Sequence, residues 1–181
     1  MSMMNDDSAI LSAVAKQVTP SKPSARSREA MSTTPQQRKW VLPGFFGKSK
    51  IQTSFGSLPI EALRCRDQVR TVDGSFVAVE WVDQIKLDVA FLELHPEAHP
   101  IYVPKDTFGK SRPSQNMLLS PAQLVKVSGL TGDEKLHPAL ALTSRPQVSR
   151  MPHSGFTYYL FHCGKPVTVN VDGIWVGNTP G

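Results

Sequence analysis

Short apolar runs separated by turn-forming residues recur along the chain from about residue 48 onward. Residues 84–94 alternate Ile85, Leu87, Val89 and Phe91 with polar or small residues, a pattern that predicts a strand with one buried face. Other runs have the length and composition of short strands, at 48–53, 99–104, 117–119, 124–127, 155–161 and 166–171. Many short strands joined by turns predict an all-β domain.

Two Asp-Gly pairs mark turns between such runs. Asp73-Gly74 lies within residues 68–82 and predicts a hairpin with a type I′ turn. Asp172-Gly173 predicts a second turn, just before the last apolar run. Residues 56–63 predict a turn that leads into a single helical turn, and residues 106–115 predict a loop.

The first 39 residues have a different character. Ile10, Leu11, Val14 and Val18 stand at helical spacing and predict a short helix. Residues 19–39 are rich in Ser, Thr, Pro and Arg and have few large apolar side chains, so we expect a disordered linker. The chain is therefore expected to divide into a flexible tail, 1–39, and a domain, 40–181.

Composition supports a packed domain and excludes several partners. Hydrophobic residues make up 40% of the 181 residues, which is enough for a core. The net charge is +5, but without a block of five or six Lys or Arg the sequence does not favour a nucleic-acid partner. No apolar run approaches the roughly 18 residues that span a membrane. No Sec signal precedes the domain, so the default expectation is a cytoplasmic protein.

Candidate chemistry is sparse when it is sought residue by residue. Cys65 lies between two arginines, which lower the pKa of a thiol, and Cys163 lies beside a histidine. No CxxC pair is present, and prolines follow His95 and His99, so the sequence predicts neither a metal nor a cofactor. The residues alone give no complete catalytic set.

Three segments in order carry a family resemblance: 50–74, 99–127 and 157–181. Each resembles part of the hedgehog/intein (Hint) domain, and the middle one resembles the bacterial Hint subfamily in its Ser-Pro turn between two apolar runs, "NMLLSPAQLVKV". The resemblance covers about residues 42–181. It implies a horseshoe-like fold of short twisted strands and an activity of autocatalytic peptide-bond cleavage or splicing.

The resemblance also implies which positions would carry that chemistry. In the family, a Cys or Ser at the first position attacks the preceding carbonyl, and a His in a Thr/Ser-x-x-His turn protonates the leaving amide nitrogen. In this chain the first position falls at Gly44, which has no side chain to attack with. The turn falls at Ser120, Pro121, Ala122 and Gln123, so glutamine stands in place of the histidine.

The C-terminal junction departs from the family pattern as well. Gly177 stands where splicing members have a penultimate histidine, while the terminal asparagine is retained as Asn178. A further histidine that the subfamily often carries falls at about Pro166.

These losses occur together and predict a degenerate Hint domain that acts as a structural or binding module, with an unknown protein partner. The alternative is an active self-processing domain that uses a shifted nucleophile, Cys65 or Cys163. A weaker alternative is an acidic or nucleic-acid partner bound by the basic tail. Because related bacterial Hint proteins are often exported, the resemblance also leaves secretion by a non-Sec route open.

Overall fold

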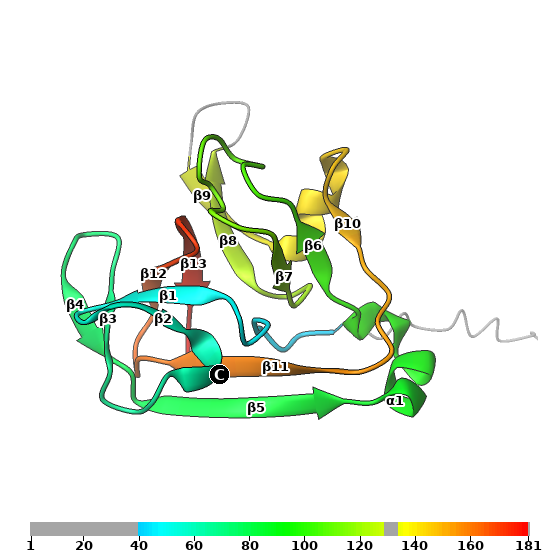
Figure 1. Cartoon of the computed structure of the whole chain (residues 1–181), viewed down its shortest axis with the longest axis horizontal. Coiled ribbons are helices and arrows are strands. Elements are labelled where there is room, and N and C mark those ends of the chain that lie inside the picture. Colours follow the sequence, from blue (N-terminus) through cyan, green and yellow to red (C-terminus); the bar gives the residue numbers. More distant parts are fainter. Residues whose placement is uncertain (1–39, 129–133, 181) are drawn as a thin grey trace, which may run out of the picture. The chain divides into compact units, whose positions relative to one another are not determined.

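The computed structural model describes residues 40–128 and 134–180. The predicted helix and linker within residues 1–39 therefore lie outside the described residues. Strands dominate, as expected for an all-β domain, and a single α-helix, α1 (Val89–Leu94), is present in the described part of the chain (Figure 1). None of the helices described is long and apolar enough to cross a membrane.

The largest sheet has eight strands and contains the first and the last strand of the described domain. Its order is β4-β3-β1-β12-β13-β8-β9, and β2 also pairs with β1. The strands are β1 (Lys50–Thr53), β2 (Gly56–Pro59), β3 (Gln68–Arg70), β4 (Phe76–Ala78), β8 (Leu124–Ser128), β9 (Glu134–Pro138), β12 (Val167–Val171) and β13 (Ile174–Asn178). The pairings of β12 with β1, of β12 with β13 and of β13 with β8 are antiparallel. The last two strands, β12 and β13, therefore lie between β1 and β8.

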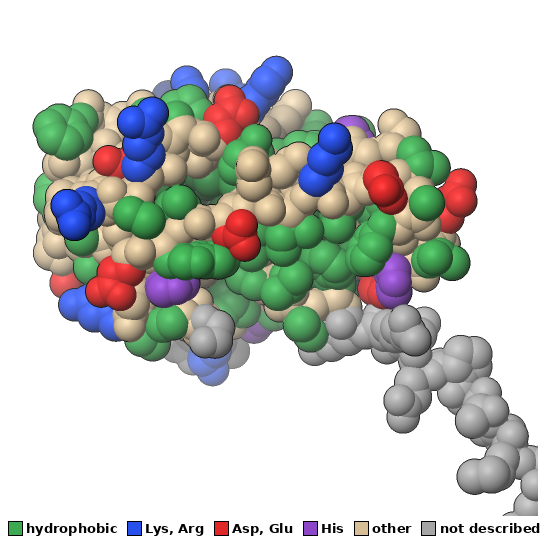
Figure 2. Space-filling model, turned by 90° about the horizontal axis from the view of Figure 1, so that it is seen from below, with side chains coloured by type: hydrophobic (Ala, Val, Ile, Leu, Met, Phe, Trp, Pro, Cys, Tyr) green, Lys and Arg blue, Asp and Glu red, His purple; other side chains and the backbone are tan. Residues whose placement is uncertain are grey.

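Two smaller sheets complete the domain. One has the order β10-β6-β7, with β6 (Ile101–Val103), β7 (Met117–Leu119) and β10 (Ser149–Arg150). The other is a two-stranded ribbon of β5 (Trp81–Leu87) and β11 (Phe156–His162). The face of the domain that carries β5 exposes hydrophobic side chains with charges of both signs scattered among them (Figure 2).

Phe45 joins the two smaller sheets. Its backbone forms bridges with Leu119 of β7 and with Tyr159 of β11. Its N–H donates to the Tyr159 carbonyl at 3.0 Å, and the Tyr159 N–H donates back at 2.9 Å. The side chain is 2% exposed and stacks on Phe161. The chain therefore enters the domain as a short extended segment between β7 and β11.

Most of the predicted strands are present, but the prediction of one strand over 84–94 is wrong. β5 ends at Leu87 and α1 begins at Val89. Asp88 is the reason, because its carboxylate accepts a hydrogen bond from the Phe91 N–H at 2.8 Å and caps the new helix. Val89 and Phe91 are two positions apart and do not share a helix face, and the helix buries Leu92 while Val89 is exposed.

The two Asp-Gly pairs form different turns. Asp172 and Gly173 both have positive φ, and Val171 pairs with Ile174, which is a two-residue type I′ loop. At the other pair only Gly74 has positive φ, so the predicted type I′ turn is wrong there. The loop has three residues closed by Thr71, which accepts from the Gly74 N–H and donates to the Ser75 carbonyl.

Several further elements were not predicted. Strand β9 includes His137 and, like β10, lies outside every predicted strand. A 3₁₀ segment, Ala139–Ser144, follows it directly. The predicted helical turn after the 56–59 region is present at Ile60–Ala62, but residues 56–59 are a strand paired with β1. A last 3₁₀ turn, Pro96–Ala98, follows α1.

Candidate functional site

A cavity of about 230 Å³ forms where the first described residues meet the turn before β8 and the end of β13. Pro43 and Gly44 line it from the first segment, Gln123 from the turn, and Gly177 and Asn178 from β13. These positions are far apart in sequence, and antiparallel pairing of β13 with β8 brings two of the three segments together. Thr179, just after β13, also lines the cavity.

Ser120 lies beside this cavity and holds the segment that leads into it. The hydroxyl of Ser120 donates to the Leu42 carbonyl and accepts from the Trp40 indole N–H at 3.0 Å. The Ser120 N–H donates to the Gly44 carbonyl at 2.9 Å. Ser120 is fully buried, so its polar atoms are committed to backbone and indole partners on both sides of Pro43.

Gln123 connects three elements from a position that is 2% exposed. Its side-chain Nε2 donates to the Gly177 carbonyl at 2.9 Å and to the Leu124 carbonyl at 3.1 Å. Its backbone carbonyl accepts from the Ala139 N–H at 2.8 Å. An amide group has two N–H donors and no titration near neutral pH, whereas a neutral imidazole has one donor. Glutamine therefore satisfies two buried carbonyls that a neutral histidine cannot satisfy together.

Asn178 is turned toward the interior of the domain. Its Nδ2 donates to the Phe161 carbonyl at 2.7 Å, and its Oδ1 is buried without a hydrogen-bond partner among the described residues. The side-chain amide of Asn178 thus links β13 to β11.

Both glycines of the site lie against close neighbours. A Cβ built on Gly44 would stand 3.0 Å from the Cβ of Tyr158, a residue with no solvent exposure. A Cβ on Gly177 would stand 3.0 Å from the Cβ of Leu124 and 3.1 Å from Leu136. Such contacts are too tight for ordinary packing, so a side chain at either position requires its neighbours to shift.

The two cysteines lie outside this cavity. Cys65 is exposed, and its Sγ lies 3.4 Å from the Glu80 carbonyl oxygen. Cys163 is buried in the main hydrophobic cluster, and burial raises the pKa of its thiol to about 11. Pro166, the position of the further family histidine, lines a different cavity together with Asn178.

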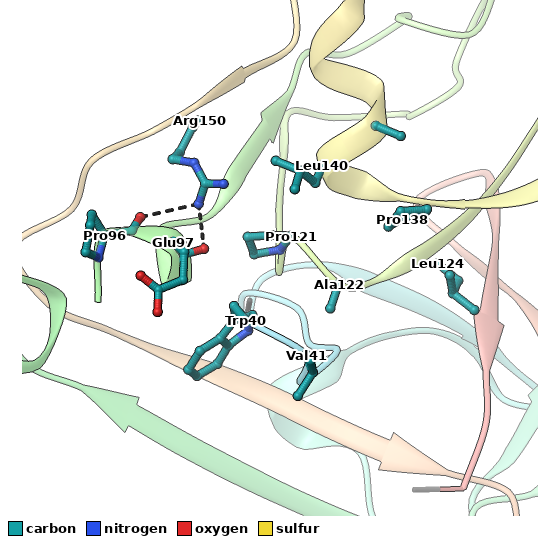
Figure 3. A pocket seen from close by; sticks show the side chains of 11 residues that line it. Trp40, Val41, Pro96, Glu97, Pro121, Ala122, Leu124, Pro138, Leu140 and Arg150 are labelled. Carbon is teal, nitrogen blue, oxygen red and sulfur yellow. Dashed lines mark hydrogen bonds between the residues drawn. The ribbon is translucent and has the colours of Figure 1, made fainter. Parts of the chain in front are cut away.

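A larger, mostly apolar cavity of about 960 Å³ adjoins the site (Figure 3). Val41, Ala122 and Leu124 line both cavities, so the turn that carries Gln123 forms the wall between them. Arg150 stands at the far side, where its Nη1 donates to the backbone carbonyls of Pro96, Glu97 and His99. Among the described residues, no group of three or more His, Cys, Asp or Glu is arranged to hold a metal ion.

The segment around Pro43 and Gly44 and the end of β13 thus line one cavity, and this shared cavity defines the class of protein. A Hint domain model matches residues 43–178, which is most of the chain. The protein therefore belongs to the Hint domain family, and the expected all-β Hint fold is confirmed.

Solved structures similar to the chain include inteins. A variant of the gp41-1 intein with three substitutions matches with a TM-score of 0.48 and 10% identity, over 75% of this chain and 98% of the intein. A splice-inactive variant of the AceL NrdHF class 3 split intein matches with a TM-score of 0.47 and 14% identity, over 76% and 98% of the two chains. The MchDnaB-1 intein matches with a TM-score of 0.45 and 8% identity, over 73% and 98%. No curated protein sequence matches the chain.

The sequence named Gly44, Ser120, Gln123, Gly177 and Asn178, and the structure brings these five positions together. Sequence reasoning missed Tyr158 and Leu136, which pack against the two glycines, and Trp40, which binds Ser120. Tyr158 and Leu136 are far in sequence from the glycines that they contact, so the local sequence gives no signal of these contacts.

Proposed function

We propose that this Hint domain does not process its own chain and serves as a structural or binding module. The observation that carries the proposal is the composition of the 230 Å³ cavity. None of its described lining residues is titratable, because Gln123, Asn178 and Thr179 supply its polar side chains. Acid–base catalysis of acyl transfer needs a group that exchanges a proton near the working pH.

The lack of an activated nucleophile also supports the proposal. Gly44 offers no side chain, and the Ser120 hydroxyl donates to the Leu42 carbonyl with the Trp40 indole as its other partner. The indole N–H is a donor and cannot accept the hydroxyl proton. Thr179 is a hydroxyl in the cavity, but no base lines the cavity beside it.

Packing gives a third line of support. A nucleophilic side chain at position 44 would press on Tyr158, and an imidazole at position 177 would press on Leu124 and Leu136. A side chain at either position therefore requires neighbouring atoms to move by a few tenths of an ångström, in addition to the exchange of the reactive groups.

The site instead holds the polypeptide that leads into it. Residues 40–46 are bound through Ser120, Leu118 and Tyr159, on both sides of the Pro43–Gly44 peptide bond. The adjoining apolar cavity, lined in part by Trp40, Pro121 and Leu140, gives a binding module a concave surface next to this segment (Figure 3).

The alternative is active self-processing through Cys65 or Cys163. Neither cysteine lines the cavity that contains Pro43 and Gly44. Cys163 in addition has a raised thiol pKa, which disfavours the thiolate that attacks a carbonyl. We therefore favour the module without cleavage.

Intact mass spectrometry of the purified chain tests the proposal. We expect one species at the full mass of 19.9 kDa, unchanged after incubation with dithiothreitol or hydroxylamine, which cleave thioesters and esters. Cys65→Ser and Gln123→Ala should give the same spectrum apart from the mass of the substitution. A fragment that begins at Gly44 would overturn the proposal.

A second set of variants tests whether a histidine at position 123 and a cysteine at position 44 are enough to give cleavage. Gln123→His should not restore cleavage, because Gly44 still supplies no nucleophile. Gly44→Cys combined with Gln123→His should also remain uncleaved, since Tyr158 crowds position 44 and position 177 has no imidazole. Cleavage at Pro43–Gly44 in the single Gln123→His variant would mean that Gly44 is not the family's first position.

A further inference from the structure

A polar cavity of about 300 Å³ lies further along β8, where Lys126 and Val127 line it. The loop before β7, strands β8, β9 and β13, and the residue after the Ala139–Ser144 segment all contribute to it. Its charged lining residues are Arg112, Lys126, Arg145 and Glu134. Its aromatic lining residues are Phe108 and Trp175, both half-buried.

The charges of this cavity do not balance. Three cations face one acid, and Glu134 forms a salt bridge to Lys126 with an N–O distance of 2.8 Å. Within residues 40–128 and 134–180, neither Arg112 nor Arg145 forms a salt bridge. Arg112 also acts electrostatically on the Glu134 carboxylate, but the described lining residues keep a net positive charge, which attracts an anion from solution.

The guanidinium of Arg145 and the backbone of Arg112 are both fixed by Phe108, while Arg112 is an exposed residue. The Arg145 guanidinium lies 5.2 Å from the centre of the Phe108 ring, which is a cation–π contact. The Phe108 N–H donates to the Arg112 carbonyl at 2.7 Å, and the Arg112 N–H donates to the Gly109 carbonyl at 2.9 Å. Phe108 thus links both arginines, one through its ring and one through its backbone.

We propose that this cavity binds a phosphate ester carried on an aromatic ring system, of the size of a nucleoside monophosphate. Guanidinium groups match the oxygens of a phosphate with paired hydrogen bonds, and they keep their charge at all physiological pH values. Trp175 gives the ring system a surface to stack on. A volume near 300 Å³ corresponds to the lower end of small-molecule pockets.

Calorimetric titration of the full chain with adenosine monophosphate, inorganic phosphate and adenosine tests this proposal. We expect adenosine monophosphate to bind more tightly than phosphate, and adenosine to bind more weakly than either. Arg112→Gln and Arg145→Gln should each weaken the binding of adenosine monophosphate about tenfold, the loss expected for one charged hydrogen-bonding partner.

Two other variants make the test specific. Glu134→Gln removes the acid from an exposed position and frees Lys126, so it should tighten binding several-fold without a risk to folding. Arg70→Gln removes an exposed arginine of β3, outside the cavity, and should leave the affinity unchanged.

Three results would overturn the proposal. The first is no binding of adenosine monophosphate by protein that circular dichroism shows to be folded. The second is equal weakening by Arg70→Gln and Arg145→Gln, which would mean attraction by net charge alone. The third is binding of a single-stranded oligonucleotide without binding of adenosine monophosphate, which would assign this surface to nucleic acid.

Discussion

Gln123 shows how a single buried side chain can join separate elements of the domain. Its Nε2 satisfies the carbonyls of Leu124 and Gly177, and these bonds join β8 to β13 inside the domain. A buried carbonyl without a partner costs about 1–3 kcal/mol. The side chain of Gln123 therefore contributes to the free energy of unfolding.

Gln123→Ala should lower the free energy of unfolding by about 3 kcal/mol, because two carbonyls lose their donor and a cavity forms. Gln123→Met is the matched control, since it keeps most of the volume and removes the donors, and we expect a loss of about 2 kcal/mol. Urea denaturation of the three proteins measures both values. If Gln123→Ala stayed within about 0.5 kcal/mol of the parent, the hydrogen bonds of Gln123 would have no structural role.

At the scale of elements, the type I′ turn between β12 and β13 contains an unusual buried acid. Asp172 is 3% exposed, and its Oδ1 accepts from Gln115 while its Oδ2 has no partner among the described residues. Gly173 lies so close to the 106–115 loop that a Cβ would stand 2.6 Å from the Ser111 carbonyl oxygen. The turn and the loop are therefore packed together with a carboxyl group enclosed between them.

Because Asp172 is buried, the free energy of unfolding depends on pH. Burial raises the pKa of Asp172, so the folded state holds the proton more tightly than the unfolded state. The group's contribution to stability is complete below the ordinary pKa of about 3.9 and is lost as the pH rises through the folded value. Asp172→Asn should therefore raise the melting temperature at pH 7, with a gain that disappears near pH 3.

Asparagine also suits the positive φ of position 172 and keeps an oxygen for Gln115. Thermal unfolding of both proteins across this pH range gives the comparison. A lower melting temperature for Asp172→Asn at pH 7 would show that the carboxylate has a stabilising partner.

The elements also show what the sequence could predict. The length and composition of apolar runs identified most strands, and two Asp-Gly pairs identified both hairpins, because strand composition and turn chemistry are local properties. The prediction for residues 84–94 failed because the alternation continues past Leu87, whereas the cap at Asp88 starts a helix that buries Leu92 instead. β9 failed because its exposed, charged residues have no buried face to signal a strand.

The candidate site was predictable in part for a different reason. Family motifs placed Gly44, Ser120, Gln123, Gly177 and Asn178, and the fold brings them to one place. The contacts that fill the site come from Tyr158, Leu136 and Trp40, which depend on how separate sheets pack. The basic cavity likewise draws Arg112 from a loop and Arg145 from the end of a 3₁₀ segment, and no motif connects the two.

At the scale of the whole molecule, the segment 40–46 decides where the domain begins. Trp40 and Phe45 pack into the interior through Ser120, Tyr159 and Phe161. We predict that a chain beginning at residue 40 has the melting temperature of the full protein. A chain beginning at residue 47 should be strongly destabilised, because β7 and β11 lose the backbone partner that lies between them.

Circular dichroism and thermal unfolding of the two shortened chains measure the difference. Equal melting temperatures of both chains would mean that residues 40–46 contact the domain without stabilising it. A loss of stability on removal of residues 1–39 alone would place part of the domain before Trp40.

The close contact between Gly44 and Tyr158 has a consequence for reading related sequences. In a chain with Cys or Ser at the position of Gly44, the residue that corresponds to Tyr158 has to leave room for that side chain. Position 158 can thus serve as a marker that is independent of the reactive residues themselves. Chains in which a nucleophile stands at the position of Gly44 should carry glycine or have a displaced backbone at position 158, because the nearest atom of Tyr158 is its Cβ, which every residue except glycine has.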